Sequence, residues 1–139
     1  MGAMFGLLIA DDDVDSRARL AKMLIDEGYD VVVTDRASHV IEGILKDMAR
    51  VVILGGQVDG LRASDLLPVL KRCKSDVKVI IASGEESLPA LRKLRKEGIF
   101  YHFVKPIRVE DSDEVRQVVQ CAFGNIRSLP RHPEGVAGP

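Results

Sequence analysis

The sequence predicts an α/β fold: a single domain with a doubly wound parallel sheet built from five βα units. Five short apolar segments alternate with five segments whose apolar residues recur at helical spacing. The strand segments are continuously apolar, which is typical of parallel strands that are covered on both faces. The 139 residues contain no internal repeat and suffice for one domain with its own core.

Runs of apolar and β-branched residues predict the five strands. In chain order they are Phe5–Ala10, Tyr29–Thr34, Val51–Leu54, Val77–Ala82 and Ile99–Val104. Right-handed crossovers leave few possible strand orders. They also bring the carboxyl ends of the strands to one edge of the sheet, where open α/β proteins bind their ligands.

Apolar residues three and four positions apart predict a helix after each strand. Polar residues that precede these helices are the expected N-caps, and glycines the expected ends. The predicted caps are Asp15 or Ser16, Ser38, Ser64 and Ser87, the acids at 111–113 begin the last helix, and Gly28 and Gly98 end the first and fourth. The stretch between the third strand and its helix, GGQVDGLRA, is predicted to be a loop.

Composition excludes several classes of protein. Hydrophobic residues make up 46% and charged residues 29%, as in soluble globular domains, and the net charge of −1 gives no basic footprint for nucleic acid. No apolar run has the length of a membrane span, and the start lacks the basic region of a signal peptide. Cys73 and Cys121 match no metal or redox spacing. We expect a cytoplasmic protein that binds neither membrane nor nucleic acid.

The domain is expected to occupy residues 5–123. Residues 1–4 are interpreted as an N-terminal extension or tag. Residues 124–139 are rich in proline and glycine without periodicity, which predicts a flexible tail or linker.

Three consecutive carboxylates, Asp11, Asp12 and Asp13, directly follow the first strand. Adjacent like charges repel, so this run does not serve stability alone, and carboxylates are the ligands that a hard divalent cation prefers. The plainer interpretation is a polar turn in which one aspartate caps the next helix. Ser83 and Lys105 end two further strands, where a hydroxyl and a compact cation suit a phosphoryl group.

Three motifs at these strand ends resemble the receiver domain of two-component response regulators. They are LLIADDDVDSRARLAKML, IIAS and GIFYHFVKP, and the resemblance covers Phe5 to Phe123. It implies a flavodoxin-like sheet in the order 2-1-3-4-5. It also implies that Asp11 and Asp12 bind Mg²⁺, that Ser83 and Lys105 act on the phosphoryl group, and that His102 occupies a switch position.

The main departure from the family is Gly55. The family carries its phospho-acceptor aspartate at the end of the third strand, and an ungapped alignment puts Gly55 there. Glycine cannot form an acyl phosphate, and the loss of a third carboxylate is expected to weaken Mg²⁺ binding. Asp59 replaces the acceptor only with a register shift of four residues, and the plainer interpretation of Asp59-Gly60 is a turn. The plainer interpretation of His102 is a partly exposed histidine on an edge strand.

We therefore expect a degenerate receiver in phosphorelay signalling that acts through protein–protein interaction. The expected partner is a histidine kinase or another signalling protein, and a homodimer through the last two helices is a further expectation. No enzymatic activity is expected beyond autophosphorylation from a kinase phosphohistidine. Two alternatives remain open: a Mg²⁺-dependent receiver that is phosphorylated on Asp59 or an N-terminal aspartate, and a flavodoxin-like module for a phosphate ligand. Against the phosphate-ligand module, no predicted strand is followed by a glycine-rich loop of the kind that binds phosphate.

Overall fold

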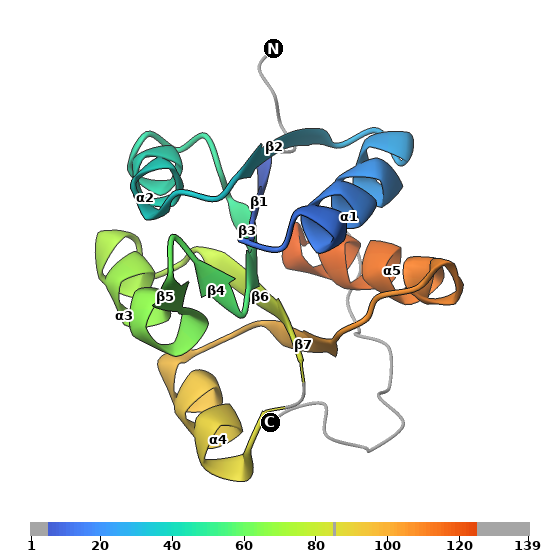
Figure 1. The fold of residues 1–139 in the computed structure, drawn as a ribbon. Helices are drawn as coiled ribbons and strands as arrows, with labels where there is room; N and C mark the ends of the chain where they lie inside the picture. Colours follow the sequence, from blue (N-terminus) through green and yellow to red (C-terminus); the bar gives the residue numbers. More distant parts are fainter. Residues whose placement is uncertain (1–5, 85, 125–139) are drawn as a thin grey trace.

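The computed structural model describes residues 6–84 and 86–124. Its main sheet has five parallel strands in the order β2-β1-β3-β6-β7, which is the predicted 2-1-3-4-5 order of the five sheet strands (Figure 1). These strands are β1 (Gly6–Ala10), β2 (Asp30–Thr34), β3 (Val51–Gly55), β6 (Lys78–Ser83) and β7 (Tyr101–Val104). The predicted fold is confirmed.

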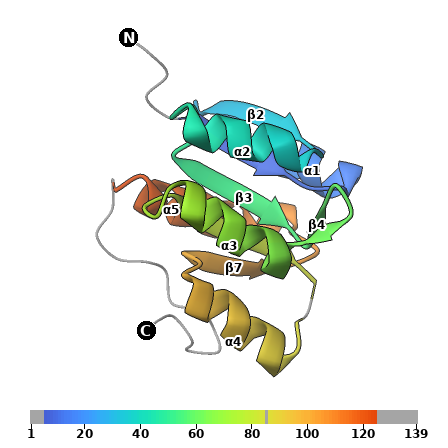
Figure 2. The ribbon, with the colours of Figure 1, turned by 90° about the vertical axis from the view of Figure 1, so that its left-hand side faces the viewer.

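Within residues 6–84 and 86–124, five α-helices cover the two faces of the sheet. They are α1 (Val14–Asp26), α2 (Ala37–Leu45), α3 (Ala63–Cys73), α4 (Leu88–Glu97) and α5 (Ser112–Ala122), with a 3-10 turn η1 (Val109–Asp111) before α5. Helices α1 and α5 lie on one face, and α2, α3 and α4 lie on the other (Figures 1 and 2). In the part of the chain that the structure describes, no helix is both long and apolar enough to cross a membrane.

The central strands β1 and β3 are continuously apolar because their two faces belong to two cores, whereas Val32 and Val33 of the edge strand β2 are exposed. Leu7 and Ile9 of β1 pack with α1 and α5, whereas Leu8 and Ala10 pack with the other three helices. All five residues of β1 and of β3 are buried. Each fully buried aliphatic side chain contributes roughly 1.5–3 kcal/mol to folding. The two cores therefore hold the strand ends rigidly at the edge where the predicted site lies.

The helix starts differ from several predicted caps. Asp13, rather than Asp15 or Ser16, caps α1 by accepting a hydrogen bond from the Ser16 amide at 3.2 Å. Helices α2 and α3 begin one residue before the predicted caps Ser38 and Ser64. Their N-cap residues, Arg36 and Arg62, form no capping hydrogen bond with their side chains. Ser87 caps α4 as predicted.

The predicted loop after β3 contains a small antiparallel hairpin. Its strands are β4 (Gln57–Val58) and β5 (Leu61–Arg62). Asp59 and Gly60 connect them with positive φ angles of 57° and 74°, which is typical of a type I′ turn. Val58 is fully buried, so the hairpin is fixed to the domain. The predicted extension at 1–4 and nearly all of the predicted tail at 124–139 lie outside the described residues.

Candidate functional site

The carboxyl ends of the strands meet at one edge, as the fold class predicts. β1 ends before Asp11, β3 ends at Gly55, β6 ends at Ser83, and Lys105 follows β7. An open cavity of about 510 Å³ lies at this edge. Its lining includes Asp11, Asp12, Asp13, Gly56, Arg62, Ser64, Ser83, Glu86 and Lys105.

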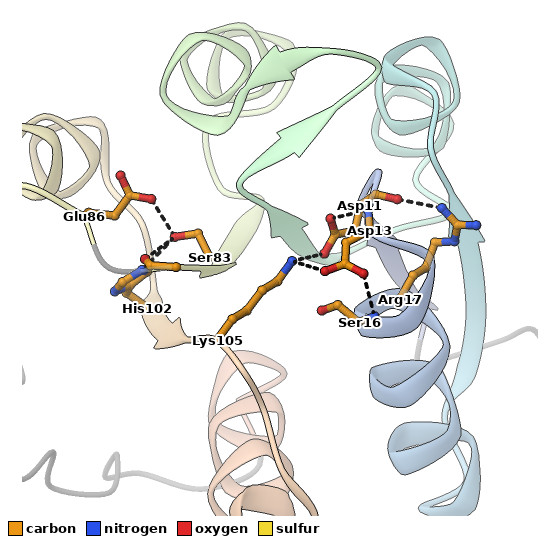
Figure 3. A network of polar contacts seen from close by, with 9 residues as sticks. Asp11, Asp13, Ser16, Arg17, Ser83, Glu86, His102 and Lys105 are labelled. Atoms are coloured by element: carbon orange, nitrogen blue, oxygen red, sulfur yellow. Dashed lines mark hydrogen bonds and ion pairs between the residues drawn. The ribbon is translucent and has the colours of Figure 1, made fainter.

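Lys105 is the cation that pairs with the aspartates at this edge. Its Nζ lies 2.7 Å from Asp11 Oδ2 and 3.7 Å from Asp13 Oδ2 (Figure 3). The Asp11 side chain is only 4% exposed and that of Lys105 18%, so this ion pair is largely shielded from water. Asp11 Oδ1 also accepts a hydrogen bond from the Asp13 amide at 2.9 Å. Both oxygens of the buried carboxylate are therefore bound within the protein.

The Asp13 carboxylate makes two polar contacts at the start of α1. It caps the helix through the Ser16 amide, and its carboxylate faces Lys105. The hydrogen bond from the Ser16 amide has the largest effect on the pKa of the Asp13 carboxyl and lowers it. Partial burial raises this pKa by a smaller amount, and the charge of Lys105 lowers it again. The plainer interpretation of the aspartate run, a helix cap, therefore applies to Asp13.

Asp12 does not join Asp11 in a shared site. Its Oδ1 accepts the Asp59 amide at 2.7 Å and its Oδ2 accepts the Gly60 amide at 2.9 Å. Asp59 in turn accepts the Ala37 amide at 3.1 Å through its own Oδ2 and thereby caps α2. Asp12 thus holds the turn of the β4–β5 hairpin, and Asp59 connects that turn to the start of α2.

This arrangement does not suit a metal ion. Within 6–84 and 86–124, no group of three or more His, Cys, Asp or Glu side chains is placed to hold one. Asp11 is paired with Lys105, and both oxygens of Asp12 accept backbone amides. Mg²⁺ requires an octahedral shell with carboxylate oxygens turned toward it. The predicted Asp11–Asp12 pair offers no such shell in this conformation.

Ser83 belongs to a second cluster at the same edge. Its hydroxyl lies 2.8 Å from Glu86 Oε2 and 2.9 Å from His102 Nε2, while Lys105 points toward Asp11 and Asp13 (Figure 3). A further contact of this hydroxyl is the Gly84 carbonyl oxygen at 3.3 Å. Because carboxylate and carbonyl oxygens only accept, they take the single hydroxyl hydrogen, and His102 must donate from Nε2.

Tyr101 faces the opposite side of the sheet from His102, as strand parity predicts. Its hydroxyl donates to Glu114 Oε2 of α5 at 2.7 Å, and its ring packs against Phe103 with centroids 5.0 Å apart. Burial raises the pKa of the Tyr101 phenol, and the hydrogen bond to Glu114 raises it further. His102 is partly buried on the edge strand, in agreement with its plainer interpretation.

Two contacts of the site were not predicted from the sequence. Glu86 binds Ser83 from the segment between β6 and α4, and Arg17 donates from Nη1 to the Asp11 carbonyl oxygen at 2.6 Å. An acid three residues after Ser83 was a weak signal, because loops commonly carry acids. Arg17 lies within the first motif, but nothing in the sequence signals its contact with the Asp11 carbonyl oxygen.

Comparisons with known proteins identify the family and the fold of this chain. Residues 7–120 match the family model of the response regulator receiver domain. The DNA-binding transcriptional regulator NtrC of Rhizobium meliloti is 29% identical over 89% of this chain and 25% of its own length. The chain thus spans about a quarter of the length of the NtrC relatives it matches.

Solved structures show the same fold. The receiver domain of NtrX from Brucella abortus matches with a TM-score of 0.75 at 24% identity, over 86% of this chain and 99% of that one. The beryllofluoride-activated NtrC4 receiver domain dimer matches with a TM-score of 0.74 at 22% identity, over 85% and 95%. With the family model covering most of its length, this chain belongs to the response regulator receiver domain family.

Proposed function

We propose that this receiver domain signals through protein–protein contact without carrying a phosphoryl group. The observation that carries the proposal is Gly55, which ends β3 at the family's acceptor position and has no side chain to phosphorylate. The ion pair of Lys105 with Asp11 supports it, because the cation that would neutralise a phosphoryl group already has an internal partner.

The same contacts support weakened Mg²⁺ binding. Receiver domains generally bind Mg²⁺ at their acidic site. Here Asp11 faces Lys105, Asp12 faces two amides, and Gly55 contributes no oxygen. A cation would have to displace Lys105 and open the hairpin turn at once. We propose that Mg²⁺ binds this domain more weakly than it binds a receiver domain with a complete acidic site.

The structure favours neither alternative function. The Asp59 carboxylate caps α2, and Asp59 is not part of the cavity lining beside Lys105. Among its described residues, the cavity lining carries more negative than positive charge, which disfavours an anionic phosphate ligand. The acidic residues are Asp11, Asp12, Asp13 and Glu86, and the basic ones are Lys105 and Arg62.

The partner is proposed to be a histidine kinase or another signalling protein. Receiver domains bind histidine kinases and can form dimers. The beryllofluoride-activated NtrC4 receiver domain is an example of such a dimer. A homodimer through α4 and α5 would use the basic outer face of α4, which includes Arg92 and Arg95. Non-enzymatic action, a cytoplasmic location, and the absence of membrane or nucleic-acid binding by this domain belong to the same proposal.

The test is intact-mass spectrometry after incubation with acetyl phosphate and excess Mg²⁺. Wild type is expected to keep its mass. The positive control is a receiver domain with an intact acceptor aspartate, which is expected to gain one phosphoryl group under the same conditions. A phosphoryl group on the wild-type protein would refute the proposal. Asp59→Ala, Asp12→Ala and Asp11→Ala would then identify the acceptor.

A further inference from the structure

Position 55 has no room for a side chain while Asp11 keeps its present conformation. A Cβ atom on Gly55 would lie 2.2 Å from Asp11 Cγ and 2.4 and 2.5 Å from its two carboxylate oxygens. Non-bonded carbon atoms approach to about 3.5 Å at best. The carboxylate and any side chain at position 55 therefore exclude each other.

The requirement for glycine at this position is steric and not conformational. The positive φ angles of the described glycines belong to Gly28, Gly60, Gly98 and Gly124, so the backbone of Gly55 suits any residue. A glycine inside a strand otherwise weakens it, because glycine loses more conformational freedom on folding than alanine does. An alanine at this site would stabilise β3 if Asp11 were absent.

Asp11 cannot leave this place without losing both of its polar partners. Its Oδ2 accepts from Lys105 Nζ at 2.7 Å, and its Oδ1 accepts from the Asp13 amide at 2.9 Å. The side chain is only 4% exposed, so little water is available to replace these two partners. Removing the carboxylate from these bonds would leave the Lys105 ammonium without its nearest counter-charge.

We infer that Gly55 and Asp11 form one interdependent unit, in which the missing side chain at the end of β3 admits the Asp11 carboxylate as the internal counter-ion of Lys105. Gly55 is thus a positioning residue for the Asp11–Lys105 pair. The inference rests on the proposed function and extends it: the acceptor position lacks a side chain, and the Asp11 carboxylate occupies the space that a side chain would need. An aspartate restored at position 55 must displace Asp11 and place two carboxylates beside one ammonium.

The test is a double-mutant cycle read as the thermal midpoint of unfolding. In the wild-type background, Gly55→Ala is expected to lower the midpoint by several degrees. In the Asp11→Ala background, the same substitution is expected to raise it, because only the strand preference of alanine remains. Gly56→Ala is the matched control. Its Cβ would meet only Ser83 Cβ at 3.3 Å, so its effect should be the same in both backgrounds.

Amide hydrogen exchange gives a second measurement that does not need Asp11→Ala to fold. The Asp13 amide is expected to exchange several-fold faster in Gly55→Ala than in wild type, and unchanged in Gly56→Ala. The inference would be overturned if Gly55→Ala had the thermal midpoint of wild type and the Asp13 amide exchanged at the wild-type rate. It would also be overturned if Gly55→Ala changed the midpoint equally in the wild-type and Asp11→Ala backgrounds. Neither readout involves phosphoryl transfer, so the inference and the proposed function can fail separately.

Discussion

Replacing Lys105 by methionine keeps the aliphatic stem of the side chain and removes the charge opposite Asp11. The Asp11 side chain is 4% exposed and its oxygen lies 2.7 Å from Lys105 Nζ, so the substitution leaves a buried carboxylate without its cation. Breaking a buried ion pair in this way typically costs about 3–5 kcal/mol. We expect about 3 kcal/mol, because Asp11 keeps the hydrogen bond from the Asp13 amide and Lys105 is partly exposed.

The assay is urea unfolding followed by far-ultraviolet circular dichroism, since the protein has no tryptophan. The loss corresponds to a fall of roughly 10 °C in thermal midpoint for a domain of this size. The control is the double variant Lys105→Met/Asp11→Asn, in which a neutral amide replaces the buried charge, and most of the lost stability should return. Added Mg²⁺ should not restore Lys105→Met, because Asp12 is bound to the hairpin turn. Equal stability of wild type and Lys105→Met, or no recovery in the double variant, would refute this reasoning.

Three further substitutions test the surrounding contacts. Asp12→Ala should lower the free energy of unfolding by about 1–3 kcal/mol, because two hairpin amides lose a charged acceptor, and urea unfolding measures this directly. Asp13→Ala should cost about 1 kcal/mol through the lost cap of α1. The pKa of Asp13 is lowered in the folded protein, so this cost should be full above about pH 4 and fade as the pH drops further; equal costs at neutral and acid pH would contradict that. The pKa of Tyr101 is raised, so its contribution should be complete below about pH 10 and decline at higher pH, and the stability difference from Tyr101→Phe should shrink there.

The fold was predictable because it depends on patterns that are local in the sequence. Continuous apolar runs identified the strands, and helical spacing identified the helices between them. The predicted burial on both faces holds for β1 and β3 but not for the edge strand β2, where Val32 and Val33 are exposed. The positions of Asp11, Gly55, Ser83 and Lys105 at one edge follow directly from parallel strands.

The orientation of the site side chains was not predictable in the same way. Asp11 and Asp12 are adjacent, but one faces Lys105 and the other faces the β4–β5 turn, which lies 47 residues along the chain from Asp12. The cap of α2 likewise comes from Asp59, 22 residues away, instead of from Ser38. Such contacts depend on how distant segments meet in space, and a capping rule that considers only nearby residues misses them.

The hairpin contacts also have a consequence for local opening of the molecule. Asp59 donates its amide to Asp12 and accepts the amide of Ala37, so three separate segments share one chain of hydrogen bonds. Surface connections usually open independently of each other at little free-energy cost. Here the end of β1, the hairpin turn and the first turn of α2 should open and close as one cooperative unit, and a partner that grips any one of them would steady the other two.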